Sequence, residues 1–386
     1  MTIRHTIVFT SPLHAEILAG ADCVVARPVR SNSGVLLLAR RVGEDPTDGE
    51  VAVHLGPGGL EVTSNVVAGV LPDSTGQVPV GAARVVGDSW RLLLPQNEDG
   101  LSVTFDRQIR AFGPDGQRVL TQLRVGIVGA GGTGSAVFEQ LVRIGVGQIL
   151  IIDPDTINDD GSNVTRVYGS TMADVGKAKV DLAKRNADQI GFGTRVTAVT
   201  GTINDVATAQ LLTTCDVIFG CTDDNRGRVT LARIATWYLI PVIDMGVKLT
   251  STNGTLRGIE GRITSLGPAT GCLQCRGRIS AAALQTEVLN PIERERRIEE
   301  GYAQGLDDRD PAVIAFTTGV AAHAVSELLQ RIFALNDSPS GELIIRFHRR
   351  DIRRNTRSGR PGHWCTDPNN VGVGDTAPFL GTLWTS

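Results

Sequence analysis

The chain has 386 residues, 41% of them hydrophobic and 20% charged, which is enough to bury a full core and to build two or three domains. A formal net charge of -3 excludes a global attraction to nucleic acid or acidic membranes. No apolar run approaches the roughly 20 residues that span a bilayer, and the N-terminus MTIRHTIVF lacks the apolar stretch of a secretory signal. We therefore expect a globular, cytoplasmic protein without a membrane partner.

Short apolar runs separated by Gly, Pro, Asp and Asn fill residues 1–104. This pattern is typical of strands, and it predicts a strand-rich accessory domain. The segment FDRQIRAFGPDGQRVLTQL, which starts at residue 105, favours a helix instead. The pattern is α/β from that point on.

Strands and helices alternate after the first helix. The expected strands are RVGIV, QILIID, TRVTAVTG, DVIFG and PVIDMGV, with helices near 135–145, 203–213 and 226–239 and a long buried helix over 312–333. This alternation predicts an α/β domain over 105–340 with a doubly wound, mainly parallel sheet. The strand GELIIRF and a basic tail form the last expected segment, 341–386.

A glycine-rich turn, GAGGTG, joins the first predicted strand of this domain to the first helix. Gly129, Gly131, Gly132 and Gly134 let the backbone approach a phosphate or ribose, and the helix N-terminus favours anions. Asp153 ends the next strand, where a carboxylate can bind ribose hydroxyls. These residues alone fit an NAD-dependent oxidoreductase equally well, and a purely structural tight turn remains an alternative.

Polar residues beyond Asp153 favour a triphosphate over a dinucleotide. The loop that begins at Asp155 supplies Asn163, Arg166 and Lys179, two of which are cationic. Asp223 follows the strand DVIFG at the sheet edge where ligands bind, and its carboxylate is a suitable ligand for Mg²⁺. The alternative for the two cations is a surface ion pair.

In these motifs the chain resembles the ThiF family, which contains the molybdopterin and thiamine sulfur-carrier adenylyltransferases and, more distantly, ubiquitin-activating enzymes. The resemblance covers about residues 105–335. It rests on GxGGxG at 129–134, the aspartates of IIDPD, SN-x-x-R at 162–166, G-x-x-K at 176–179, and CTDD followed by Arg228. It implies a Rossmann-like ThiF fold.

The resemblance also implies roles for individual residues. The residues that match Asn163, Arg166 and Lys179 bind ATP phosphates in that family, and the match of Asp223 is the essential Mg²⁺ ligand. The segment FDRQI resembles a family motif whose arginine reaches the ATP of the other subunit; Arg107 is the matching residue, so we expect a homodimer. The chain departs from the family at Asp224, where asparagine is usual, and in a longer loop after Asp155.

The cysteines indicate a metal site, since six cysteines in this pattern are no disulfide framework. Cys272 and Cys275 have the C-x-x-C spacing that lets two thiolates hold one tetrahedral Zn²⁺. In the tail, PGHWCTDP offers His363 and Cys365 to complete an unusual Cys₃His site, with Cys365 the safer ligand. A metal-free reduced pair and redox chemistry are the alternatives. Cys215 and Cys221 flank a buried strand and are predicted to be core thiols.

Two regions have no assigned chemistry. Seven arginines lie between Arg346 and Arg360, which form either a solvated rim or a dock for an acidic partner or RNA. The N-terminal region resembles, by its position, the JAB-type domains of some bacterial relatives. His5, His14 and His54 lack the close spacing that a zinc peptidase of that type needs, so we interpret the domain as an inactive scaffold or a docking domain.

The leading hypothesis is an enzyme that uses ATP and Mg²⁺ to adenylate the C-terminal carboxylate of a ubiquitin-like or sulfur-carrier protein, or of a ribosomally made peptide. A tRNA-modifying ThiF-like dehydratase is the alternative within the superfamily. A degenerate member kept as a binding or dimerisation module is a second class, and an NAD-dependent oxidoreductase is a third. The oxidoreductase leaves CTDD, Arg107 and the cysteines unexplained.

Overall fold

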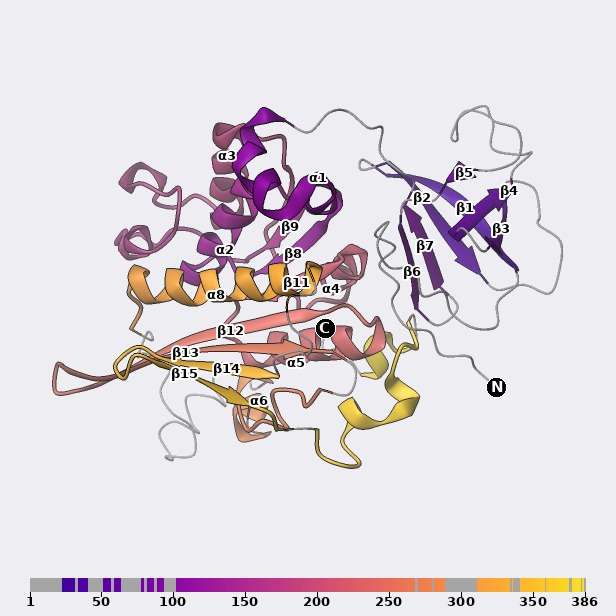
Figure 1. Cartoon of the computed structure of the whole chain (residues 1–386). Helices are drawn as coiled ribbons and strands as arrows, with labels where there is room; N and C mark the ends of the chain where they lie inside the picture. The colour runs from indigo at the N-terminus through magenta and orange to yellow at the C-terminus, as the bar shows by residue number, and fades with distance from the viewer. Residues whose placement is uncertain are drawn as a thin grey trace. The chain divides into compact units, whose positions relative to one another are not determined.

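The computed structural model describes the strands between residues 23 and 93 and residues 102–267, 270–279, 281–288, 311–333, 335, 341–357, 359–374, 377–382 and 384 (Figure 1). The chain divides into two compact units. The first contains Met1–Gly100, Thr236–Leu239 and Pro368–Leu383, and the second contains Leu101–Ala235, Ile240–Asp367 and Trp384–Ser386. The boundaries expected from the sequence stay a prediction.

The first unit holds a seven-stranded sheet in the order β5-β4-β3-β1-β2-β7-β6. Its strands are β1 (Cys23–Ser31), β2 (Gly34–Arg40), β3 (Val51–Gly56), β4 (Gly59–Thr63), β5 (Val78–Pro79), β6 (Ala82–Val86) and β7 (Ser89–Leu93). Neighbouring strands are antiparallel, which agrees with the strand-rich region expected from short alternating runs. His5 and His14 lie outside the described residues, as do the side chains of Cys23 and His54.

The second unit is built on an eight-stranded sheet in the order β10-β9-β8-β11-β12-β13-β14-β15. Its strands are β8 (Arg124–Val128), β9 (Gln148–Ile152), β10 (Arg195–Val199), β11 (Val217–Gly220), β12 (Val242–Thr252), β13 (Thr255–Leu266), β14 (Glu342–Arg346) and β15 (Asp351–Asn355). The first five in spatial order are parallel, and β13, β14 and β15 add antiparallel pairs. The predicted α/β class and doubly wound sheet are confirmed, whereas the sequence analysis placed the residues of β15 in the basic tail and predicted no strand there.

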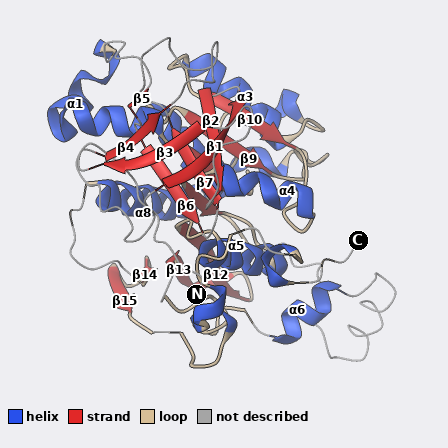
Figure 2. Cartoon of the chain, turned by 90° about the vertical axis from the view of Figure 1, so that its right-hand side faces the viewer, coloured by secondary structure: helices blue, strands red, loops and turns tan. Residues whose placement is uncertain are grey.

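Helices cover both faces of this sheet, and Figure 2 gives a second view of them. They are α1 (Asp106–Gln122), α2 (Gly132–Arg143), α3 (Lys179–Ile190), α4 (Val206–Leu211), α5 (Asn225–Trp237), α6 (Ala281–Val288) and α8 (Ile314–Ile332). Short 3-10 turns occur at Val103–Phe105, Ser162–Thr165, Met172–Asp174, Leu212–Thr214, Trp364–Thr366, Pro368–Asn370 and Phe379–Gly381. The expected long helix over 312–333 corresponds to α8. Among the described helices, none has the length and apolarity needed to cross a bilayer.

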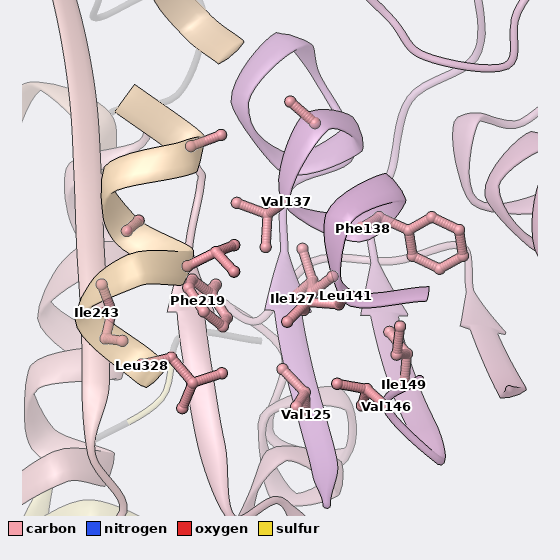
Figure 3. Packing of buried hydrophobic residues seen from close by; sticks show 14 of the residues in the cluster. Val125, Ile127, Val137, Phe138, Leu141, Val146, Ile149, Phe219, Ile243 and Leu328 are labelled. Carbon is pink, nitrogen blue, oxygen red and sulfur yellow. The ribbon is translucent and has the colours of Figure 1, made fainter. Parts of the chain in front are cut away.

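The main core lies between the sheet and the pair α2 and α8. Val125 and Ile127 of β8 and Phe219 of β11 point toward Leu141 of α2, and Leu328 of α8 closes the same layer (Figure 3). Each of these side chains is buried, and each such burial contributes about 1.5–3 kcal/mol. Alternate residues of β8 face the other side, which explains why apolar runs without a polar face form these strands.

The order of the sheet fixes where a ligand can bind. The chain runs from β8 outward to β9 and β10, then returns to β11 on the other side of β8 and continues to β12. The loops after β8 and β11 therefore leave the sheet side by side at its carboxyl edge. The backbone N–H of Cys221 donates to the carbonyl of Val128 at 2.8 Å. In sheets of this type, ligands bind at this topological switch point.

Candidate active site and metal centre

The glycine loop after β8 is shaped by close backbone packing. Gly129 has a φ of 94°, and its N–H donates to the carbonyl of Ile152 at 2.8 Å. A Cβ on Gly134 would lie 1.8 Å from the carbonyl oxygen of Gly129, so only glycine fits there. By contrast, no described atom lies within 4 Å of the Cβ position of Gly131, at the N-terminus of α2. The loop thus has one packed side and one open side, and the open side adjoins a helix N-terminus suited to anions.

Asp153 ties this loop to the end of β9. Its carboxylate is only 5% exposed and accepts the N–H of Ala130 at 2.5 Å and that of Asp155 at 2.8 Å. Burial raises the pKa of Asp153, and the nearby charge of Lys179 opposes that shift. The structure therefore gives Asp153 a role in fixing the glycine loop, while binding of ribose stays a prediction.

The segment after Asp155 folds back so that Lys179 meets the carboxylates at the end of β9. Ile157 exchanges backbone hydrogen bonds of 2.9 Å with Gly176 and Lys177, and Lys179 donates its N–H to the carbonyl of Asp155. A small apolar cluster of Ile157, Val167 and Leu182 fixes this fold. The Lys179 ammonium lies 2.7 Å from Asp155 and 3.7 Å from Asp153.

Arg166 reaches the glycine loop, whereas Asn163 supports the loop that carries it. Asn163 is 4% exposed, and its Oδ1 accepts the N–H of Asn158 at 2.7 Å. A Cβ on Gly132 would lie 3.4 Å from the Cδ of Arg166. The Arg166 guanidinium is half-buried and donates to the carbonyl of Ser162 at 3.2 Å. The structure thus brings Arg166 next to the glycine turn, as expected, and finds Asn163 engaged within its own loop.

Asp223 and Asp224 differ sharply despite being neighbours at the carboxyl end of β11. Asp223 is exposed, and its carboxylate accepts no hydrogen bond from the described part of the chain. Asp224 accepts the N–H of Gly227 at the start of α5 and the hydroxyl of Thr222. Asp224 thus caps the start of α5, a role that the family's asparagine can also fill, and Asp223 is left available to a ligand.

Glu287 is a site residue that the sequence analysis missed. It lies on α6, in the connection beyond the C-x-x-C motif, and its carboxylate accepts the N–H groups of Asn225 and Arg226, both at 2.9 Å. The side-chain amide of Asn225 donates to it as well, at 2.6 Å. This carboxylate binds the first turn of α5, directly after Asp223. No local pattern links two residues so far apart in sequence.

Arg228 lies over β12, which carries the buried Asp244, a residue that the sequence analysis did not identify. The Nε of Arg228 is 3.7 Å from the Oδ2 of Asp244, and Arg262 binds the Oδ1 of the same carboxylate at 2.5 Å. The structure places Arg228 at the same carboxyl edge as Asp223, and the expectation that Arg228 binds the nucleotide stays a prediction.

Arg107, which is expected to reach the site of the other subunit, lies away from the glycine loop of its own chain. It is exposed at the start of α1, and its neighbour Gln108 donates to the carbonyl of Arg143 at 3.1 Å. The ring of Phe105 lies 5.4 Å from that of Phe192. These contacts are with residues that precede β9 and β10, so Arg107 lies at the amino edge of the sheet, opposite Asp223. Its role in the site of a partner subunit stays a prediction.

The four expected metal ligands converge. The ligand atoms of Cys272, Cys275, His363 and Cys365 all lie within 4.8 Å of one another. His363 Nδ1 is 3.2 Å from the Cys365 sulfur, which is 3.7 Å from that of Cys275. A hydrogen bond between the thiols of Cys272 and Cys365 lowers the pKa of Cys272 and raises that of Cys365. Three sulfurs and one imidazole are a donor set that fits tetrahedral Zn²⁺.

The other two described cysteines fit the expectation of core thiols. Cys215 is 0% exposed. Burial raises the pKa of Cys221, and the charge of Asp244 raises it further. The Cys221 thiol is therefore not in the ionised form that acts as a nucleophile.

Comparison with known proteins identifies a family and several relatives that this chain resembles. The sequence model of the ThiF family matches residues 105–361. Molybdopterin-synthase adenylyltransferase of Escherichia coli is 31% identical over 179 residues, which are 45% of this chain and 68% of that protein. The SAMP-activating enzyme E1 of Haloferax volcanii is 27% identical over 163 residues, 42% of this chain and 56% of the relative.

A solved structure supports the fold independently. Escherichia coli MccB, determined with ATP, superposes with a TM-score of 0.53 at 18% identity, over 68% of this chain and 74% of MccB. At this identity the likeness concerns the fold alone. The family match begins at residue 105, so the strands β1 to β7 of the first unit lie outside it.

Proposed function

The chain belongs to the ThiF family, and from this membership we propose that it activates a carboxylate by transferring AMP to it from ATP. The named relatives include an adenylyltransferase and an activating enzyme. The observation that carries the proposal is the convergence of the glycine loop, Arg166, Lys179 and Asp223 at one edge of the sheet. An oxidoreductase has no use for two cations and an exposed aspartate at that edge.

ATP would bind along the open side of the glycine loop. The N-terminus of α2 adjoins this side and favours the phosphates. Arg166 is next to the loop, and Lys179 has its ammonium at the end of β9. Cationic groups in these places would bind the triphosphate and stabilise the charge of departing pyrophosphate.

Asp223 would hold Mg²⁺. An exposed carboxylate with no hydrogen bond from the described residues is a suitable oxygen ligand for this ion. When bound, Mg²⁺ would neutralise phosphate charge. Asp224 is committed to capping α5, so it keeps Asp223 in place and is no equal candidate.

The reaction needs positioning more than acid or base groups. A carboxylate oxygen of the substrate attacks the α-phosphorus of ATP, the bond to the bridging oxygen breaks, and pyrophosphate leaves with that electron pair. The products are an acyl adenylate and pyrophosphate. The chain's task is to align the two reactants and to balance the charge, which Arg166 and Lys179 are placed to do.

Glu287 supports the placement of a substrate tail. By binding the start of α5, it holds α6 next to Asp223. Helix α6 would thereby flank an extended C-terminal segment as it approaches the α-phosphate. We assign the substrate to the class of ubiquitin-like or sulfur-carrier proteins, or ribosomally made peptides.

The Cys₃His group would hold a structural Zn²⁺. All of its donors come from two segments, the loop after β13 and the tail after β15, so the ion would join them. A homodimer is part of the proposal, since Arg107 lies at the wrong edge to serve its own chain. Arg107 of the partner subunit would then complete each site.

ATP–pyrophosphate exchange tests the proposal directly. The protein is incubated with ATP, Mg²⁺, labelled pyrophosphate and single candidate carriers or peptides that end in a free carboxylate. Label should enter ATP only when the cognate carboxylate is present, and amidation of that C-terminus should abolish the exchange. No exchange with any sulfur-carrier protein or peptide encoded beside the gene would count against adenylation.

A further inference from the structure

Asp244 is a fully buried carboxylate next to the proposed site. It lies on β12 opposite Gly220, the last residue of β11, and Asp223 follows Gly220 closely. Its exposed fraction is 0%. A Cβ on Gly220 would lie 3.1 Å from the Oδ2 of Asp244, so the glycine leaves the room that this carboxylate fills. A buried carboxylate is costly unless it is paired.

Two arginines share this one carboxylate. Arg262 donates to Oδ1 at 2.5 Å, and the Nε of Arg228 lies 3.7 Å from Oδ2. A Cβ on Gly246 would lie 3.5 Å from Nη2 of Arg228 and 3.6 Å from Nη2 of Arg262. Both guanidinium groups therefore lie over the same face of β12. One negative charge faces two positive charges, which leaves a surplus positive charge at the sheet edge.

The two arginines are held differently. Arg262 is fixed in the sheet, because it also donates to the hydroxyl of Thr264 at 2.5 Å. Arg228 has no such second anchor: its Nε and the Oδ2 of Asp244 are both buried and have no hydrogen-bond partner in the described part of the chain. A separation of 3.7 Å lets charge hold Arg228 while its guanidinium remains able to turn toward a ligand.

We propose that Asp244 is a positioning residue for Arg228. It holds the Arg228 guanidinium at the carboxyl edge of β11 by charge, and its pairing with Arg262 leaves Arg228 with positive charge for an anionic group of the reactants. This inference rests on the proposed function for the nature of that group, a phosphate of ATP or the substrate carboxylate. The competing interpretation is that Asp244 only neutralises Arg262 as part of the core.

A double-mutant cycle on pyrophosphate exchange separates these interpretations. Asp244→Asn keeps the shape of the side chain and removes its charge, and Arg228→Gln removes the guanidinium. Each should lower kcat/KM by about tenfold, and the double variant should be no worse than Arg228→Gln alone, because Asp244 acts through Arg228. Losses that multiply in the double variant would overturn the proposal. The KM for ATP and the KM for the carboxylate, measured separately, identify which anion Arg228 meets.

Glu342→Gln is the matched control. Glu342 is also 0% exposed and paired with an arginine, Arg278 at 2.7 Å, but it contacts Thr264 and not Arg228. Its effect should multiply with that of Arg228→Gln. If Glu342→Gln is instead masked by Arg228→Gln to the same degree as Asp244→Asn, the coupling is a general effect of buried charge, and the proposal fails.

Urea unfolding tests the contact between Asp244 and Arg228 independently of the proposed function. If the unaltered protein catalyses no exchange, the proposed function fails, yet the same variants still report the contact. Arg228→Gln should lower the unfolding midpoint less in the Asp244→Asn background than in the unaltered chain. Equal shifts in both backgrounds would overturn the pairing. Asp244→Ser, whose side chain fits the same space, takes the place of Asp244→Asn in both cycles if the latter does not fold.

Discussion

The ammonium of Lys179 lies 2.7 Å from the carboxylate of Asp155, a side chain that is 63% exposed, while Lys179 itself is only 7% exposed. The same ammonium lies 3.7 Å from the buried carboxylate of Asp153, so Lys179 is held between one exposed and one buried carboxylate. Only the contact with Asp155 faces solvent, and a phosphate can replace it there. We therefore expect the ammonium to bind a phosphate while Asp153 keeps it at the end of β9.

Replacement of Lys179 by alanine should therefore impair the reaction more than the fold. We expect Lys179→Ala to lower kcat/KM for ATP by about a hundredfold, because it removes a cation from the developing phosphate charge. Lys177→Ala is the control, since Lys177 forms a comparable pair with Asp174 at 2.9 Å but is 54% exposed. Steady-state exchange kinetics measure both. Equal losses in the two variants would mean that Lys179 has only a structural role.

Asp223→Ala should abolish adenylation and leave the fold intact. The side chain is exposed and makes no hydrogen bond with the described residues, so its removal costs no core contact. Loss of the proposed Mg²⁺ ligand should lower exchange by at least about a hundredfold. Asp188→Ala, which removes an exposed carboxylate from α3, should have no effect. Normal exchange by Asp223→Ala, with an unchanged thermal midpoint, contradicts the assignment.

The sequence predicts the features of this protein that depend on residues close together in the chain, and it does not predict those that depend on tertiary contacts. The strands β8, β9 and β11 follow from apolar runs, and the glycine turn follows from its own spacing, because both depend on residues that are neighbours in the chain. The sequence analysis did not identify Asp244 or Glu287 as site residues. Each acquires its role from a residue brought close only by tertiary packing, Arg228 for one and Asn225 for the other.

The basic tail illustrates the same limit. The sequence analysis did not predict β15, because this arginine-rich strand has almost no apolar alternation and is stabilised by pairing with β14. Its Ile352 side chain is 51% exposed, so burial contributes little to this strand. Pairing along the edge of an existing sheet determined its conformation, and composition alone indicated only charge.

The metal centre predicts a simple stoichiometry. The purified protein should contain about one zinc ion per chain, as expected for a tetrahedral site with four protein ligands. Cys365→Ser should lower that content strongly, because the Cys365 sulfur is next to both Cys275 and His363. Metal analysis after dialysis measures it, with Cys215→Ser as a control at a buried thiol outside the group. Full zinc content in Cys365→Ser would exclude this residue as a ligand.

A homodimer with shared sites predicts rescue between inactive chains. Arg107→Ala and Asp223→Ala should each be inactive alone, since one lacks the arginine given to the partner and the other lacks its own metal ligand. Mixed and refolded together, they form some heterodimers in which one site has both residues. We expect about a quarter of the normal exchange rate, because random mixing makes half of the dimers mixed and each has one intact site. Inactivity of the mixture, or a fully active monomer, contradicts the shared site.

The last prediction concerns the fate of the adenylate. Ubiquitin-activating enzymes, which the chain resembles distantly, pass the acyl group to a cysteine beyond the metal cysteines, but residues 276–335 contain no cysteine here. Cys215 is buried, and the raised pKa of Cys221 keeps it protonated. The acyl group should therefore go directly to an external nucleophile, such as a sulfur donor, a thiol of a partner protein or a nitrogen of the peptide itself.

A gel experiment checks this expectation. Enzyme, ATP and the cognate substrate are incubated, and the mixture is run without reductant and again after treatment with thiol. No thiol-sensitive conjugate of enzyme and substrate should form, while pyrophosphate release confirms that the adenylate was made. A conjugate that disappears both with thiol and with Cys23→Ser would identify a nucleophile in the first unit. Loss of such a conjugate in Cys221→Ser would instead mean that this thiol ionises despite its burial, and either result would replace direct transfer by a covalent relay.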